Sequence, residues 1–224
     1  NANSSKNMML KVIPRTAAAD VDAAIILEPF SSSRLPLFHT RIPCCIHLGK
    51  FSYAVCNLAN KAATARDLLG RLQIAYENLP KWMQQGILTW NKGSLELENG
   101  SKIMAASTSA AAVRGMTFNI IFLDEFAFVP NHIADDFFSS VYPTISSGQS
   151  TKIIIVSTPK GMNHFYRMWH DAENGENEYV PTAVHWSEVP NRDAAWKEQT
   201  IKNTSEQQFK VEFECEFLGS VDTL

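Results

Sequence analysis

The sequence predicts an α/β protein with a mainly parallel sheet flanked by helices. Two stretches, FNIIFLDE (118–125) and TKIIIVST (151–158), are short continuous apolar runs. A parallel sheet buries such strands on both faces, so the runs need no polar alternation. Segments with helical spacing of apolar residues lie before, between and after them. Strands that alternate with helices along a chain are typical of an α/β sheet.

The composition is that of an ordinary globular chain. Of 224 residues, 45% are apolar and 19% are charged, and the net charge of −3 gives no global basic field that would indicate nucleic acid. No apolar run is long enough to span a membrane, and NANSSKNMML (1–10) lacks the apolar core of a signal peptide. The four cysteines show no metal-ligand spacing, and we interpret them as reduced thiols of a cytosolic protein.

Residues 1–54 differ in character from the rest, and we expect an irregular N-terminal stretch. Apolar and polar residues mix there without a clear period, and four prolines interrupt them: Pro14, Pro29, Pro36 and Pro43. AAADVDAAIIL (17–27) is the one segment that favours a short helix. Because the chain begins with Asn1 rather than Met, we expect it to be a piece of a longer protein.

From residue 51 the predicted elements follow in order. FSYAVCNLA (51–59) is an apolar run rich in strand formers, and KAATARDLLGRLQIAYENLP (61–80) has apolar residues at helical spacing. SLELENGSKIMAAS (94–107) alternates between apolar and polar residues around Asn99-Gly100, which is a strong hairpin signal.

The second half predicts four helices and one further strand. Asn131 is the expected N-cap of the first helix, and Ser205 with Gln208 forms a capping box that opens the last. The helices are predicted over NHIADDFFSSVYPTI (131–145), NHFYRMWHDA (163–172), DAAWKEQTIKN (193–203) and SEQQFKVEFECEF (205–217), and the strand over YVPTAVHW (179–186).

Asp124 and Glu125 end the first apolar strand. In open α/β sheets the working residues lie at the carboxyl ends of the strands. Because successive strand residues point to opposite sides, the two acids need not repel at full strength, so one can hold a hydrated Mg²⁺ while the other orients a water. Phosphoryl transfer needs this division of labour. The alternative is a pair of acids that ends a strand by chance.

Ser157 and Thr158 end the second apolar strand, directly before Pro159. Two hydroxyls at the tip of a strand parallel to the first could sense a γ-phosphate by hydrogen bonding. The alternative is a plain strand end that Pro159 turns.

These motifs resemble the ATPase domain of the large terminase subunit, the DNA-packaging motor of tailed bacteriophages, particularly of the T4-like branch. The resemblance covers roughly 58–224, through LANKAATARDLLGRL, LPKWMQQG, WNKGSLELENGSKI, AVRGMTF, FLDEFAFVPN, PTISSGQSTKIIIVSTPKGMNHFYRMW and FECEFLGS. It implies a P-loop NTPase-type sheet whose N-terminal part is incomplete or non-native here. Residues 55–224 would then be the C-terminal part of the ATPase domain, without the family's nuclease domain.

The resemblance implies a role for each residue that matches a family motif. Asp124 matches the Walker B aspartate, which binds the Mg²⁺ of Mg-ATP, and Glu125 matches the catalytic glutamate, which activates the attacking water. Ser157 and Thr158 match the coupling motif that links hydrolysis to DNA movement. Arg114, within AVRG, matches an arginine that reaches a neighbouring subunit's ATP, where a guanidinium can offset charge on the transferring phosphoryl group. The alternative for Arg114 is a surface ion pair.

The sequence departs from the family at the phosphate loop, GxxxxGK[ST]. IHLGKFS (46–52) contains Gly-Lys, but Phe51 stands where a hydroxyl should ligate Mg²⁺. Three explanations remain: a shifted reading frame upstream of about residue 55, a fragment that has lost its loop, or a diverged protein that binds something without hydrolysing ATP. We favour the first two, and any of the three would leave this chain without ATPase activity.

For the parent protein, the resemblance implies the cofactors ATP and Mg²⁺ and several partners. They are double-stranded DNA, the portal protein, the small terminase subunit and further copies of the chain in a ring. The location would be the host cell cytoplasm and, transiently, the procapsid, with no membrane. Two other readings stay open: a helicase-like ATPase, and a non-catalytic module that docks on DNA or the portal.

Overall fold

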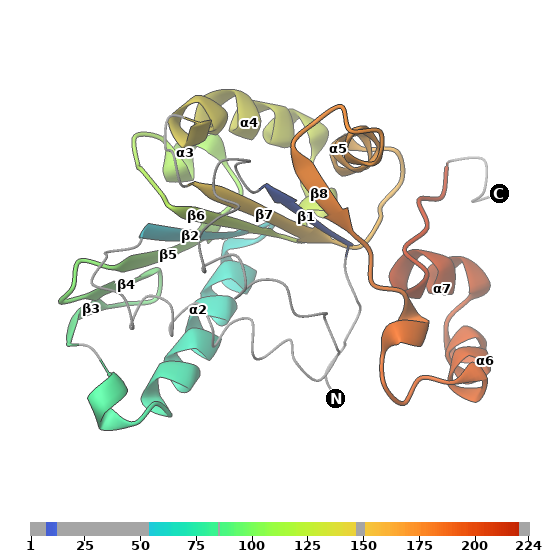
Figure 1. Cartoon of the computed structure of the whole chain (residues 1–224), viewed down its shortest axis with the longest axis horizontal. Helices are drawn as coiled ribbons and strands as arrows, with labels where there is room; N and C mark the ends of the chain where they lie inside the picture. Colours follow the sequence, from blue (N-terminus) through green and yellow to red (C-terminus); the bar gives the residue numbers. More distant parts are fainter. Residues whose placement is uncertain (1–7, 13–53, 85, 147–150, 220–224) are drawn as a thin grey trace.

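A computed structural model describes residues 8–12, 54–84, 86–146 and 151–219. Within these ranges, eight strands form one sheet in the order β3-β4-β5-β2-β6-β7-β1-β8 (Figure 1). Helices cover both faces of the sheet, so the predicted α/β class is confirmed.

The centre of the sheet is parallel, as predicted. Its four strands are, in spatial order, β5 (Lys102–Ser107), β2 (Ala54–Ala59), β6 (Ile120–Asp124) and β7 (Lys152–Ser157). The register places Asp124 between Ala59 and Val156. The carboxyl ends of all four strands therefore meet at one edge of the sheet, which we call the carboxyl edge.

The outer strands run antiparallel to their neighbours. On one side lie β4 (Ser94–Leu97) and β3 (Ile87–Trp90), and β4 and β5 form the predicted hairpin with Gly100 at φ 80°. On the other side lie β1 (Met8–Val12) and β8 (Tyr179–Thr182). The sequence did not predict β1, because MMLKV has no period of its own and gains its partners only from β7 and β8. The helix expected over residues 17–27 lies outside the described residues.

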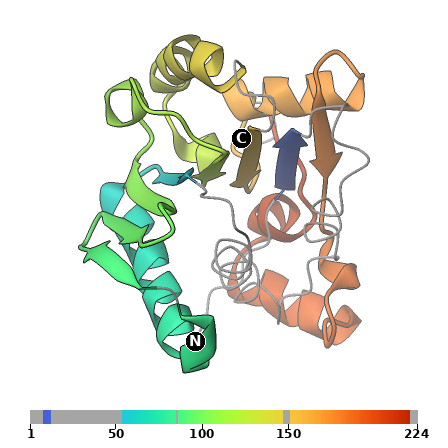
Figure 2. The same cartoon turned by 60° about the vertical axis from the view of Figure 1, so that its left-hand side comes forward.

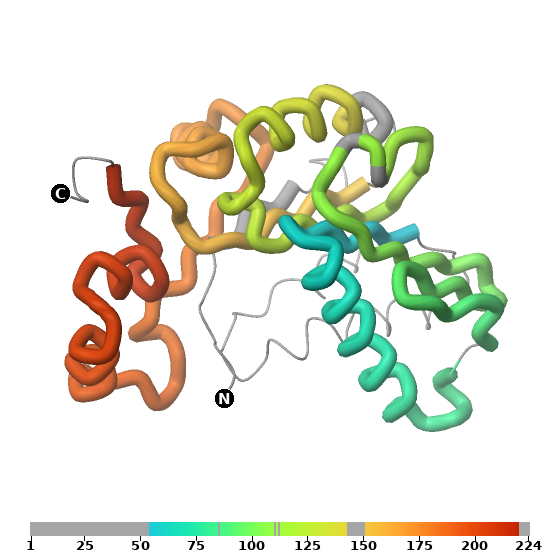
Figure 3. Tube along the Cα trace, turned by 180° about the vertical axis from the view of Figure 1, so that it is seen from behind, coloured from blue at the N-terminus to red at the C-terminus, as the bar shows by residue number. Residues whose placement is uncertain are grey.

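The helices divide between the two faces of the sheet, as Figures 1 and 3 show. One face carries α3 (Ala110–Val113), α4 (Asn131–Ser146) and α5 (His164–Glu173). On the other side lie α2 (Ala62–Glu77) and the pair α6 (Ala194–Asn203) and α7 (Glu206–Phe213), which Figure 2 shows as separate arms. Short 3-10 turns are η3 (Lys81–Met83), η4 (Phe126–Phe128) and η5 (Trp186–Glu188).

The core lies on both faces of the parallel strands. Under α4 and α5, Leu123 and Ile155 pack with Phe137 and Phe165, and all four are fully buried. Under α2, the buried face of the helix packs on β2 and β5. Each buried side chain of this size stabilises the fold by about 1.5–3 kcal/mol, so the sheet is a firm base for its carboxyl edge.

The C-terminal helices have a small aromatic core. Trp196 stacks on Trp186 at 6.0 Å and meets Phe213 edge-on at 5.3 Å between ring centroids. Ser205 caps α7 by accepting a hydrogen bond from the Gln208 N–H, as predicted. The helix predicted over 205–217 is wrong in its last turn, because the left-handed φ of 60° at Cys215 stops it. No helix among the described residues has the length and apolar character to traverse a bilayer.

Candidate active site

Asp124 and Glu125 lie together at the carboxyl edge. Asp124 is the last residue of β6, and its Oδ1 accepts a hydrogen bond from the Glu125 N–H at 3.1 Å. Glu125 has a φ of 54°, in the left-handed region that costs a non-glycine residue about 1–2 kcal/mol. The strand alternation expected to separate the two carboxylates is therefore wrong here, because β6 ends at Asp124. Surrounding structure must hold Glu125 in this conformation.

Both carboxyls are harder to ionise than usual. Burial, then the charges of Asp124 and Glu212, raises the pKa of Glu125 from 4.5 to about 7. Burial also raises the pKa of Asp124, while the Glu125 N–H and the Arg71 guanidinium lower it. A carboxylate with a pKa near the working pH is suited to accept a proton from water.

Two residues of this site were missed by the sequence analysis. Glu212 comes from α7 and Arg71 from α2, and the charges of both act on the acidic pair. Burial raises the pKa of Glu212 as well. Arg71 was interpreted only as part of a solvated helix face. No local pattern marks either residue, because each reaches the site through tertiary packing.

Ser157 lies beside the acidic pair but points into the fold. Its side chain is fully buried, and its Oγ accepts a hydrogen bond from the Ala127 N–H at 3.0 Å. Thr158 is buried too, at 2% exposed. The structure therefore places both hydroxyls at the tip of β7, with that of Ser157 joining this tip to the turn that follows Glu125.

Arg114 lies outside this group. Its exposed side chain donates from Nη2 to the Ser140 Oγ on α4 at 3.1 Å. Of the cations in the described ranges, Arg71 and not Arg114 acts on Asp124. The structure thus brings Asp124, Glu125 and the β7 tip together and leaves Arg114 on the surface.

A groove of about 610 Å³ adjoins the acidic pair. It runs between the loop after β7 and α7, and Glu212 is in its wall. On the loop side, the Lys160 Nζ lies 4.5 Å from the centroid of the Phe128 ring. The other lining residues are Pro159, Gly161, Met162, Ser205, Gln207, Gln208, Val211, Leu218 and Gly219.

The direction of β1 bears on the missing phosphate loop. β1 is antiparallel to β7, with Met8 opposite Ser157 and Lys11 opposite Ile154. The chain therefore enters β1 at the carboxyl edge and leaves it, at Val12, at the opposite edge. A loop that followed β1 directly would lie far from Asp124. The described residues supply carboxylates for a nucleotide site and no glycine-rich cradle for its phosphates.

The donor set can be compared with the needs of Mg²⁺. Within the described part of the chain, no group of three or more His, Cys, Asp or Glu side chains could hold a metal ion by itself. Mg²⁺ in nucleotide sites needs less, since it is usually bound by one or two carboxylates, several waters and the phosphates of the substrate. Asp124 fits this role, because its carboxylate is partly exposed at the edge and only one cation acts on it.

Residues 42–224 match the family model described as terminase large subunit, T4likevirus-type, N-terminal. This chain belongs to that family. The match confirms the resemblance inferred from the motifs and extends it upstream to residue 42.

Solved structures share the fold of this terminase chain. The large terminase ATPase domain of Thermus phage P74-26 has a TM-score of 0.59 and 19% identity, over 83% of this chain and 86% of that domain. The HK97 bacteriophage large terminase has a TM-score of 0.61 and 14% identity, over 82% of this chain and 44% of that protein. A large terminase from a thermophilic bacteriophage in complex with ADP has a TM-score of 0.59 and 10% identity, over 81% and 44%. This chain thus spans less than half of the length of the last two proteins.

Proposed function

We propose that this terminase chain is part of the ATPase of a motor that moves double-stranded DNA into a viral capsid. The observation that carries the proposal is the acidic pair at the carboxyl edge, where the pKa of Glu125 is raised to about 7. The family membership and the ATPase domains among its structural relatives support the same function. Residues 55–224 are assigned to the C-terminal part of that ATPase domain.

Asp124 and Glu125 divide the chemistry. Asp124 would hold Mg²⁺, which when bound supplies positive charge to the phosphates of ATP. Glu125 takes a proton from a water onto its carboxylate oxygen, and the pKa near 7 keeps a large fraction of the side chain ionised and yet basic at neutral pH. Burial of the pair strengthens these interactions by excluding water.

Ser157, Thr158 and Arg114 serve the motor rather than the chemical step within one subunit. Ser157 connects the tip of β7 to the turn after Glu125, which supports the role of Ser157 and Thr158 in coupling hydrolysis to movement. Arg114 is exposed and has only the Ser140 hydroxyl as a described hydrogen-bond partner, so it is free to reach the ATP of a neighbouring subunit in a ring.

The missing phosphate loop limits what this chain does alone. Without a Lys and a hydroxyl on the phosphates, much of the electrostatic stabilisation of the transition state is lost. We therefore expect weak ATP binding and no fast hydrolysis by the chain as printed, with full activity in a parent that carries the loop. The same absence favours a second candidate, a non-catalytic module that docks on DNA or the portal.

The partners proposed for the parent are DNA, the portal protein, the small subunit and copies of itself. DNA contacts would be chiefly to phosphate, and hence sensitive to salt and indifferent to sequence. The proposed location is the host cytoplasm, with transient attachment to the procapsid.

Binding and hydrolysis of ATP, each measured with Mg²⁺ and with chelator, test the proposal. Asp124→Asn should abolish the Mg²⁺-dependent part of ATP binding. Glu125→Gln should retain binding and lower any hydrolysis by roughly 10²–10⁴-fold, the range for a lost general base. Asp136→Asn, an exposed acid on α4, is the matched control and should change neither. Unchanged hydrolysis in Glu125→Gln, or unchanged Mg²⁺ dependence in Asp124→Asn, would contradict the assignment.

A further inference from the structure

Both backbone groups of Ala127, two residues after Glu125, are held by the segment that follows β7. The Ala127 N–H donates to the Ser157 Oγ at 3.0 Å, and the Ala127 carbonyl accepts from the Asn163 Nδ2 at 2.6 Å. Ala127 is 3% exposed, so water cannot readily replace either partner. The turn η4, which begins directly after Glu125, is thereby clamped at its middle residue.

The other two residues of η4 are tied to the same segment. Phe126 is buried, with its ring edge-on to His164 at 6.0 Å between centroids. Phe128 lies beneath the Lys160 Nζ. Every residue of the turn that follows the left-handed Glu125 therefore has a partner between residues 157 and 164.

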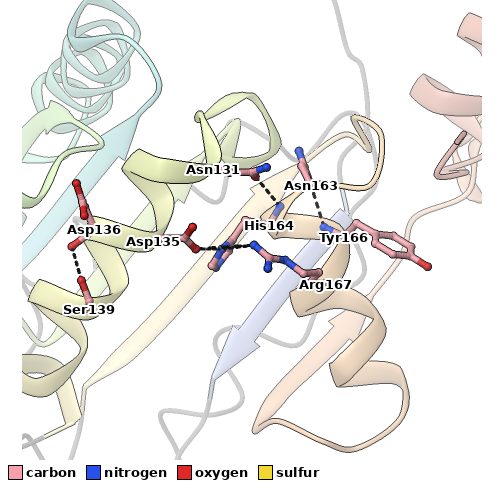
Figure 4. Close-up of polar contacts among 8 residues, drawn as sticks. All are labelled: Asn131, Asp135, Asp136, Ser139, Asn163, His164, Tyr166 and Arg167. Atoms are coloured by element: carbon pink, nitrogen blue, oxygen red, sulfur yellow. Dashed lines mark hydrogen bonds and ion pairs between the residues drawn. The ribbon is translucent and has the colours of Figure 1, made fainter. Parts of the chain in front are cut away.

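Asn163 is fixed in place by a second contact. Its Oδ1 accepts from the Tyr166 N–H at 3.1 Å and so caps α5, as Figure 4 shows. The two contacts determine the orientation of the amide, because a flipped amide would set an oxygen against the Ala127 carbonyl and an NH₂ against the Tyr166 N–H. One side chain thus both begins a helix and holds the turn beside Glu125.

The start of α5 is anchored in turn to α4. Asn131 was predicted as the N-cap of α4, but the helix begins at Asn131 and its Oδ1 instead accepts from the His164 N–H at 2.9 Å (Figure 4). The His164 Nδ1 lies 2.8 Å from the Asp135 Oδ1, with Arg167 on the same carboxylate at 3.8 Å. These contacts hold Asn163 against the face of the sheet that carries α4.

Resting on the proposed role of Glu125, we propose that Asn163 is its positioning residue. Asn163 does not touch the reacting atoms. It acts through the Ala127 carbonyl: it holds η4, and η4 fixes the left-handed backbone from which the Glu125 carboxylate projects. The motif TPKGMN brings Asn163 back to the turn, since Gly161 has a φ of 60° that few other residues adopt readily.

Asn163→Asp separates the clamp from the helix cap. Aspartate caps a helix as well as asparagine does, but it has no N–H for the Ala127 carbonyl. By hydrogen exchange and NMR relaxation, we expect the Ala127 and Phe128 amides to exchange at least tenfold faster, with lower order parameters at 125–128. The Tyr166 amide should keep its wild-type exchange rate. Asn163→Ser should behave alike, whereas Asn163→Ala should expose the Tyr166 amide too.

Asn177→Asp is the matched control. Asn177 makes the same pair of contacts elsewhere: its Nδ2 donates to the Met168 carbonyl and its Oδ1 accepts from the Tyr179 N–H. This variant should leave residues 125–128 unchanged. Wild-type exchange at Ala127 and Phe128 in both Asn163→Asp and Asn163→Ser would overturn the proposal, because Ser157 and the core would then hold the turn without Asn163.

Kinetics on a parent that carries the phosphate loop distinguish this proposal from the proposed function. A positioning role predicts that Asn163→Asp lowers kcat at least tenfold with little change in KM. An unchanged kcat, in a protein where Glu125→Gln abolishes hydrolysis, would overturn the positioning role alone. Unchanged hydrolysis in Glu125→Gln would instead overturn the proposed function, and the positioning role with it.

Discussion

Replacing Glu125 by Gln should remove a specific pH dependence from the stability of this chain. The pKa of Glu125 is raised from 4.5 to about 7 in the folded state. Below pH 4.5 both states are protonated. Between 4.5 and about 7 the unfolded chain loses its proton first, so the free energy of unfolding falls as the pH rises.

A pKa change from 4.5 to about 7 corresponds to about 3 kcal/mol. Because the side chain is only half-buried, solvent screening reduces this, and we expect a loss of about 1–2 kcal/mol. Urea unfolding at about pH 4.5 and about pH 8 measures the loss by linear extrapolation.

The wild-type chain should lose about 1–2 kcal/mol more stability than Glu125→Gln over this interval. The matched control is Glu198→Gln, an exposed acid on α6, which should follow the wild type. An equal loss in the wild type and in Glu125→Gln would refute the reasoning, since the Glu125 carboxyl would then titrate alike in the folded and unfolded states.

Three further changes test other contacts. Arg71→Ala should raise the pKa of Asp124 further, because it removes the guanidinium that favours the carboxylate; carbon-detected NMR titration measures this, and an unchanged value would show that Arg71 is too far to act. Phe126→Ala, at 1% exposed, should lower the free energy of unfolding in urea by about 3–5 kcal/mol, and a loss below about 1 kcal/mol would mean that the turn is not anchored in the core. Ser205→Ala should cost about 1 kcal/mol in the same assay through the lost cap of α7, and no loss would argue against that cap.

Local patterns predicted the parts of the fold that local interactions specify. The two apolar strands, the hairpin at Asn99-Gly100 and the helix over 61–80 appear as expected, because burial on both faces, turn chemistry and helical spacing are properties of short segments. The strand at Met8–Val12 could not be predicted in this way. Its five residues pair with β7 and β8, which follow it by more than 130 residues, and the pattern of MMLKV alone does not distinguish a strand from a loop.

The site shows the same division between local and distant signals. An apolar strand that ends in two acids placed Asp124 and Glu125 at the carboxyl edge. The left-handed backbone of Glu125 escaped the sequence analysis, since it depends on how η4 is held. Glu212 and Arg71 were missed because only the packing of α7 and α2 brings their charges to the pair.

The central claim is that a divalent cation with its nucleotide belongs beside Asp124 and Glu125. Mn²⁺ binds the same oxygen ligands as Mg²⁺ and broadens the NMR signals of nearby amides. At low Mn²⁺ with ATP present, the account predicts that the amides of residues 124–126 and 157–158 broaden first, and that Asp124→Asn abolishes this pattern while Asp136→Asn preserves it. Broadening that begins elsewhere, or that survives Asp124→Asn unchanged, would contradict the account.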